Sequence, residues 1–230
     1  MKKNSDTRVI TLAVFSCLLW SSAFVGIKSG LKYSSPLFFA GMRFFLSGLI
    51  LIPFSGKIGL YFKNFKIHFK KILIISLFQT ILLYSTLFIG MTFVPSAIGA
   101  IIIGSSPLIV SIASHISIKD DKLNLKKLIS IFIGISGIVL IAISRKPLTS
   151  KGQFELLGIL IMIVGVSASA IGNIIVSKQK QGINPVFLNS TQIGLGGIIL
   201  FLISIPAEQF KKITFNKEFI VSLIWLALLS

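Results

Sequence analysis

Apolar runs long enough to cross a lipid bilayer recur along this chain, and no other feature limits its possible folds so strongly. A transmembrane helix needs about 20 mainly apolar residues. Of the 230 residues, 54% are hydrophobic and only 13% are charged, about half the charged share of a soluble domain. The runs predict membrane helices at 9–27, 36–54, 72–91, 97–118, 128–144, 157–176 and 185–205, and the start of an eighth near Phe219.

These spans are predicted to be helices because a lipid-facing backbone must satisfy its own hydrogen bonds, and the sequence shows no short alternating strand pattern. The fold class expected is therefore all-α: a polytopic transmembrane helical bundle with about 7.5 spans present.

The basic residues lie mainly in the short segments between the apolar runs. Lys and Arg number 23 against six Asp and Glu, a formal charge of +17. In a soluble protein this excess would suggest a nucleic-acid partner, but here it has the distribution of charges that orient membrane helices. With a cytoplasmic N-terminus, 14 basic residues fall inside and eight outside. We therefore expect a multi-pass protein of the cell membrane, with no nucleic-acid partner.

The segment SGKIGLYFKNFKIHFKK, residues 55–71, alternates lysines with aromatic residues. Two interpretations are open. The segment lies on an anionic membrane leaflet, to which its lysines are attracted, or it is an ordinary cytoplasmic loop with interfacial aromatics.

An internal repeat is indicated by two similar segments. PLFFAGMRFFLSGLI (36–50) and PVFLNSTQIGLGGII (185–199) share five identical positions at an offset of 149 residues. The offset covers five spans, an odd number, so the second copy enters the membrane from the opposite side. Inverted repeats of this kind are common in secondary transporters, where the substrate site lies near the bilayer midplane. We expect a first repeat at 1–145 and a second at 146–230.

The second repeat is expected to be incomplete. At the same offset Ser230 corresponds to Ile81, in the middle of a span, and the last apolar run has only 12 residues. We therefore expect the sequence to be truncated at its C-terminus. This leaves an alternative function open: a non-transporting or inactive truncated membrane protein, or a subunit that needs a partner chain.

Three stretches resemble the EamA-like family of the drug/metabolite transporter superfamily. They are LLWSSAFVGIKSGLKYSSPLFFAGMRFF (18–45), YSTLFIGMTFVPSAIGAIIIGSSPLIVSIAS (84–114) and ISIFIGISGIVLIA (129–142), while residues 157–205 look like the start of a second copy. The resemblance implies ten helices in two inverted five-helix halves, no bound cofactor, and export or exchange of small metabolites or drugs. Ser21 replaces the family's usual glycine, and Gln192 stands at the second-copy position of Arg43.

Arg43 is the main candidate site residue, because a charge at mid-bilayer costs from about 2.5 to more than 10 kcal/mol and therefore usually faces the protein interior. Two roles are open for it: an anchor for carbonyl oxygens or an anionic group of a substrate, or a structural brace to carbonyls at a helix end.

Small and weakly polar residues recur at helical spacing in the fourth span: Ala100, Gly104, Pro107, Ser111 and Ser114. Pro107 lacks the N–H that would bond residue 103, so the helix is expected to be interrupted there. The stripe is either a cavity wall with a hinge or a surface for close helix packing. The complete set of candidate substrate or cavity residues is Trp20, Arg43, Gln79, Tyr84, Ser106, Pro107, Ser111 and Gln192.

All six acidic residues fall in predicted loops or at span edges, so none is a candidate for proton coupling inside the membrane. The sequence has no metal-ligand cluster, phosphate loop or nucleophile–base pattern, and we expect neither an enzyme nor a metal or cofactor. The function predicted is a secondary transporter that exports or exchanges amino-acid-like or drug-like metabolites by alternating access. Its expected partners are a small-molecule substrate and the lipid bilayer, and a homodimer is compatible with the sequence.

Overall fold

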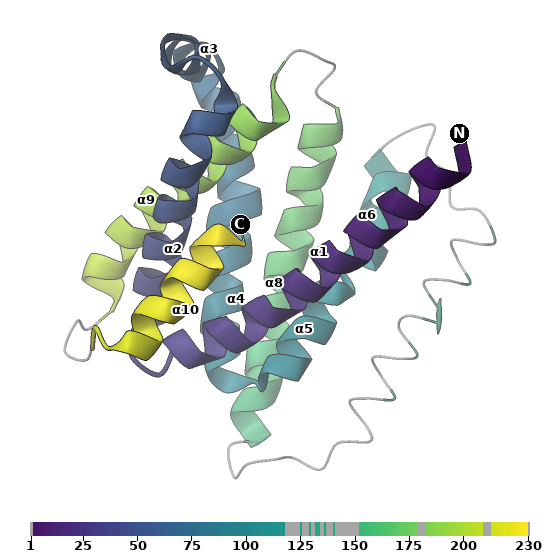
Figure 1. Ribbon diagram of the computed structural model, residues 1–230. Coiled ribbons are helices and arrows are strands. Elements are labelled where there is room, and N and C mark those ends of the chain that lie inside the picture. Colours follow the sequence, from purple (N-terminus) through teal and green to yellow (C-terminus); the bar gives the residue numbers. More distant parts are fainter. Residues whose placement is uncertain are drawn as a thin grey trace.

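The computed structural model describes residues 2–117, 152–178, 183–208 and 213–229, with isolated positions between 125 and 140 (Figure 1). All regular structure in these ranges is helical, which confirms the predicted all-α membrane bundle. The helices are α1 (Lys2–Gly30), α2 (Pro36–Leu51), α3 (Ile58–Ser76), α4 (Leu83–Phe93), α5 (Ser96–Gly104), α6 (Ser106–Ser117), α8 (Gly152–Ser177), α9 (Pro185–Ala207) and α10 (Lys217–Leu228). A 3₁₀ turn, η1 (Ile52–Ser55), follows α2, and a π-helical segment, η2 (Leu77–Leu82), joins α3 to α4.

Six helical segments of the described part are long and apolar enough to cross a membrane: Val9–Gly30, Pro36–Ser55, Ile58–Phe93, Ser96–Ser117, Phe154–Ser177 and Pro185–Ala207. Each overlaps a predicted span, so the protein is a multi-pass membrane protein. The helix predicted at 128–144 falls where only isolated positions are described. The beginning of a span near Phe219 is the 12-residue helix α10.

One of the two interpretations of residues 55–71, an ordinary loop, is wrong for most of that segment. Gly56, with φ of 105°, ends the preceding helical segment. Helix α3 then begins at Ile58 and continues through η2 and α4 to Phe93, over 36 residues. Lysine favours helix almost as well as leucine does, so the lysines between the aromatic residues extend the helix beyond the apolar run instead of ending it.

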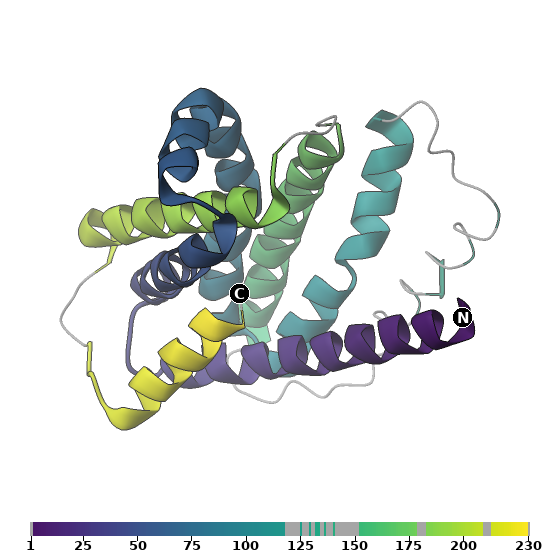
Figure 2. The same ribbon diagram turned by 45° about the horizontal axis from the view of Figure 1, so that its top comes forward.

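Among the described helices, α2 and α9 form the most extensive contact, and they run antiparallel (Figures 1 and 2). Glycines allow this approach. A Cβ added at Gly48 would lie 2.5 Å from the Cα of Gly194, and one added at Gly197 would lie 2.3 Å from the backbone nitrogen of Phe45. Within a membrane, small residues let helix backbones approach and gain van der Waals contact. This pair therefore holds together two helices that are far apart in the sequence.

Helix α2 is capped by a residue distant in sequence. The carboxylate of Glu208, directly after α9, accepts hydrogen bonds from the backbone N–H groups of Leu37 (2.7 Å) and Phe38 (2.9 Å). The first N–H groups of a helix lack partners within it and favour a negative charge. Glu208 therefore links the end of α9 to the start of α2 and supports their antiparallel packing.

Replacing Glu208 by alanine is expected to lower the free energy of unfolding by about 1–2 kcal/mol, because two N–H groups lose a charged acceptor. For a chain of this size that corresponds to a fall of about 5 °C in the unfolding midpoint. Thermal unfolding in detergent measures it. Glu208→Gln keeps one acceptor oxygen, so its unfolding midpoint should lie between those of the unaltered chain and Glu208→Ala. An unchanged midpoint for Glu208→Ala would show that the cap contributes nothing to stability.

Candidate substrate cavity

A cavity lies beside Arg43, between helices that are far apart in the sequence. Its lining residues come from α1, α2, α4, α5, α6 and α8: Trp20, Ala23, Phe24, Ile27, Arg43, Leu83, Tyr84, Leu87, Ile103, Ser106 and Ser169. Most of these side chains are apolar, and the polar groups are few. Ligand sites for small molecules commonly have this composition, in which a few polar groups orient a ligand held by apolar walls.

Arg43 is buried, with 2% of its surface exposed, although it lies within a membrane span. The prediction that it faces the protein interior is confirmed. Its Nε donates a hydrogen bond to the carbonyl of Leu226 in the last turn of α10, at 3.2 Å. Its guanidinium carbon lies 4.6 Å from the ring centre of Phe44 and 5.8 Å from that of Tyr84. Aromatic faces attract cations, so the surrounding rings help to hold the charge.

These contacts combine features of both roles considered for Arg43. The bond to Leu226 is a brace to a carbonyl near a helix end, and the position in the cavity lining also puts Arg43 within reach of a bound molecule. Arg carries five N–H donors in a fixed fork, so it can bond more than one acceptor at the same time.

Aromatic rings form part of the cavity wall. The rings of Phe44 and Tyr84 pack with centroids 4.1 Å apart, and Trp20 meets Phe24 edge-on at 6.0 Å. Trp20 is 44% exposed, so its indole lies at the edge of the cavity and not at its centre. An aromatic or other flat apolar group is the kind of molecule that such walls accommodate.

Four of the eight sequence-predicted residues line this cavity together: Trp20, Arg43, Tyr84 and Ser106. Sequence reasoning missed Ser169 of α8, which is 9% exposed and also lines it. The signal for Ser169 was weak, because it lies in a run of small residues, VSASA, that is typical of ordinary helix packing.

Gln79 and Gln192 lie outside the cavity lining. The side-chain amide of Gln79, in η2, donates to Asn173 of α8 at 2.9 Å. Gln192 of α9 is 8% exposed, and its amide nitrogen donates to Asn189 at 3.1 Å. Its backbone carbonyl accepts from the hydroxyl of Ser76 at 2.8 Å. Both glutamines therefore make contacts within or between helices.

Pro107 and Ser111 also lie outside the lining; Pro107 is exposed and Ser111 half-buried. The helix that contains them is interrupted at Ser105, between α5 and α6, close to Pro107 as predicted. The amide of Leu108 bonds the carbonyl of Ser105 in a tight turn, at 2.9 Å. Because Ile103 and Ser106 flank this turn and line the cavity, the interruption borders the cavity even though Pro107 does not.

A search of the described residues for three or more His, Cys, Asp or Glu side chains grouped to hold a metal ion finds none. The polar groups in the cavity lining are the guanidinium of Arg43 and the hydroxyls of Tyr84, Ser106 and Ser169, set among apolar and aromatic walls.

The chain is similar in sequence to several proteins named as uncharacterized transporters. It is 28% identical to the uncharacterized transporter YoaV of Bacillus subtilis, over 93% of this chain and 72% of that protein. It is 24% identical to the uncharacterized transporter YvbV of the same organism, over 99% of this chain and 72% of that protein. An uncharacterized transporter of Archaeoglobus fulgidus is 26% identical over 98% of this chain and 76% of its own length.

No solved structure matches the chain. The family described as "EamA-like transporter family" matches residues 7–143, more than half of the sequence. This match includes the spans that contribute Trp20, Arg43, Tyr84 and Ser106 to the cavity. The chain belongs to the EamA-like transporter family.

Proposed function

We propose that this protein is a secondary transporter that exports or exchanges small metabolites by alternating access, with the cavity beside Arg43 as its substrate site. The main support is the convergence of residues selected from four separate spans, Trp20, Arg43, Tyr84 and Ser106, on one cavity. The wall is completed by Ser169, which lies beyond the first repeat, so that both halves contribute to it, as the midplane site of an inverted-repeat transporter requires.

We further propose that residues 1–145 and 146–230 form two inverted repeats, and the contact between α2 and α9 supports this. At the offset of 149, Gly194 takes the place of Phe45, and Gly197 takes the place of Gly48. Gly48 packs on Gly194, and Gly197 packs on Phe45. Each helix therefore offers the same two positions to the other, which is the reciprocity expected across a two-fold axis.

The proposed change of access uses two irregular points in the helices. One is the turn at Ser105 between α5 and α6, and the other is the π-helical segment η2, which is followed directly by the cavity residues Leu83 and Tyr84. π-helical turns occur often at functional sites, and helix kinks concentrate at such irregularities. Bending at both points would move two parts of the cavity wall.

The proposed substrate class is amphipathic: an amino-acid-like or drug-like compound with an apolar body and a carboxylate or carbonyl group. The apolar and aromatic walls suit the body, and the guanidinium of Arg43 suits the oxygen-bearing group. The orientation proposed is N-terminus in the cytoplasm of a cell-membrane protein, from the distribution of Lys and Arg.

Filling the cavity tests this function. Ser169→Trp places a large ring in the cavity and is expected to lower efflux at least about tenfold per inserted molecule, because the ring competes with the substrate for space. The assay is a panel of toxic amino-acid analogues and drugs in cells that lack their own exporters. Ser167→Trp is the matched control, since Ser167 lies two residues away on α8 and is exposed. Equal efflux by both variants would place the substrate site elsewhere, and no efflux of any compound by the unaltered chain would favour the non-transporting alternative.

A further inference from the structure

A second hollow lies on the outside of the bundle, between α2, α3 and α9, and it is separate from the Arg43 cavity. Its lining residues are Phe45, Gly48, Leu49, Ile52, Tyr61, Phe62, Phe65, Ser190, Thr191, Gly194, Leu195 and Ile198. Along α9 it reaches from Ser190 to Ile198, which is about 12 Å at the rise of an α-helix. The hydrocarbon region of one leaflet is about 15 Å deep, so the groove is comparable in length to that region.

The polar side chains of the groove are already paired with protein atoms. The hydroxyls of Tyr61 and Ser190 lie 3.1 Å apart, and the Ser190 hydroxyl also donates to the carbonyl of Gly48 at 3.1 Å. The hydroxyl of Thr191 donates to the carbonyl of Phe187 at 2.7 Å. Because their hydrogen-bonding groups are engaged, the surface that remains is apolar and fits a hydrocarbon chain better than a polar solute.

The apolar walls of the groove are open to the surroundings. Phe45 is 40% exposed, Leu49 46%, Phe62 59% and Ile198 42%. Exposed apolar side chains on a membrane-spanning helix are expected to face acyl chains, and this favours a hydrocarbon occupant for the groove.

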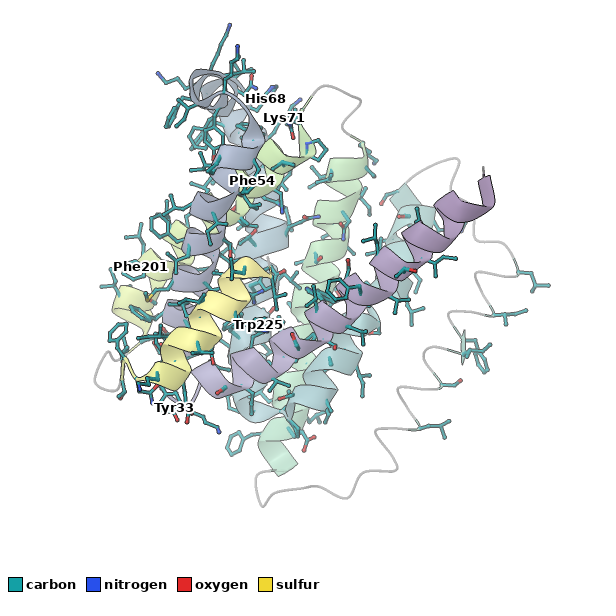
Figure 3. The ribbon with its side chains drawn as sticks, in the orientation of Figure 1. Tyr33, Phe54, His68, Lys71, Phe201 and Trp225 are labelled. Carbon is teal, nitrogen blue, oxygen red and sulfur yellow. The ribbon has the colours of Figure 1, made fainter. Side chains whose placement is uncertain are left out.

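Lys66 lies next to the groove on α3, and further lysines lie on the adjoining face of that helix. Lys63, Lys66 and Lys70 recur at spacings of three and four, so they share one face of α3, and all are exposed. Lys66 is four residues after the groove residue Phe62, so the two side chains are neighbours on the helix surface. Lys71 adds a further positive charge, and residues 55–71 contain no Asp or Glu. Figure 3 shows the side chains of this segment, including His68 and Lys71, gathered at one end of the molecule.

We propose that this groove binds one anionic phospholipid, with an acyl chain along Phe45, Leu49, Phe62 and Ile198 and the phosphate group at Lys66, where Lys63 on the same helix face adds a second positive charge. The charge of the α3 edge argues for an anionic headgroup, and the paired polar groups of the floor argue for a hydrocarbon chain. Long lysine side chains can lay their methylene stems on apolar surface and still reach a headgroup. Because α3 and α9 both line the groove, the lipid would bridge the two proposed repeats.

The headgroup half of the proposal is tested by a pair of charge-neutralising variants. Native mass spectrometry counts molecules of dioleoyl phosphatidylglycerol bound to the purified full chain during titration. Lys63→Gln/Lys66→Gln is expected to weaken the tightest binding about 30-fold, or about fivefold for each lysine near an anionic surface. Lys32→Gln/Lys217→Gln removes the same charge from exposed positions outside α3 and is expected to bind as the unaltered chain does.

The acyl half is tested by filling the groove. Ile198→Trp is expected to abolish the tightest binding, whereas Leu202→Trp, one turn further along α9, 56% exposed and outside the lining, should preserve it. Each variant is first checked for a monodisperse elution profile. Three results would each overturn the proposal. The first is equal phosphatidylglycerol binding by the two lysine-pair variants, and the second is equal binding by the two tryptophan variants. The third is binding of dioleoyl phosphatidylcholine to the unaltered chain as tightly as dioleoyl phosphatidylglycerol. These measurements do not depend on transport, so their failure would leave the proposed function untouched.

Discussion

Arg43→Ala is expected to lower transport at least about tenfold per inserted molecule, an effect as large as the one we predict for filling the cavity at Ser169. The variant removes the guanidinium from a site walled by Phe44 and Tyr84 and also breaks the bond to the carbonyl of Leu226. Insertion should not suffer, because removing a charge from a membrane span lowers its transfer cost. Efflux of a substrate found in the compound panel, normalised to inserted protein, measures the effect.

Two further variants separate the two roles of Arg43. Arg43→Lys keeps the charge but loses the planar fork, so a substrate anchor should be weakened mainly in KM. Arg43→Gln retains a hydrogen-bond donor for Leu226 without the charge, so a pure brace should keep most of its transport. Transport at the unaltered rate by Arg43→Ala would exclude both roles.

Gly48→Leu is expected to destabilise the bundle more than any substitution in the cavity. Even the Cβ of the new side chain would lie 2.5 Å from the Cα of Gly194 and 3.1 Å from the carbonyl oxygen of Ser190, so the two backbones must separate. Separation would also break the hydrogen bond from Ser190 to the Gly48 carbonyl. Overpacking and the lost bond together should cost about 3 kcal/mol, equivalent to a fall of about 10 °C in the unfolding midpoint.

Gly59→Leu is the matched control for this effect. A Cβ at Gly59 meets nothing within 4 Å, and the residue lies in the first turn of α3. The same substitution there should leave the unfolding midpoint unchanged or slightly raised, since leucine favours helix more than glycine does. Thermal unfolding in detergent measures both midpoints. A fall of similar size for Gly48→Leu and Gly59→Leu would show that Gly48 does not stabilise the fold through the α2–α9 contact.

The membrane spans were predictable because the length and polarity of each apolar run are local properties. The interior position of Arg43 followed from the cost of exposing its charge to lipid. The interruption near Pro107 followed from the missing N–H of proline. In each case one free-energy cost is much larger than the others, so the sequence alone is enough to predict the feature.

The remaining features depend on packing between distant segments, which local patterns do not specify. Gln79 and Gln192 have the same chemistry as cavity residues, but the rotation of their helices directs them to Asn173 and Asn189 instead. Ser169 enters the cavity lining by the same kind of rotation. The extension of α3 beyond the apolar run was missed because lysine-rich segments between spans usually read as loops, although their helix propensity is high.

Access to the Arg43 cavity from the two sides of the membrane decides whether it is a transport pathway. Cys17 is the single cysteine of the chain and is exposed on α1, so Cys17→Ala gives a background in which Ser106→Cys reports on the cavity alone. A membrane-impermeant methanethiosulfonate is applied to either face of oriented vesicles. We predict that the introduced thiol reacts from both faces of the membrane and that a transported compound slows both reactions. Reaction from only one face under every condition, or from neither face, would contradict alternating access through this cavity.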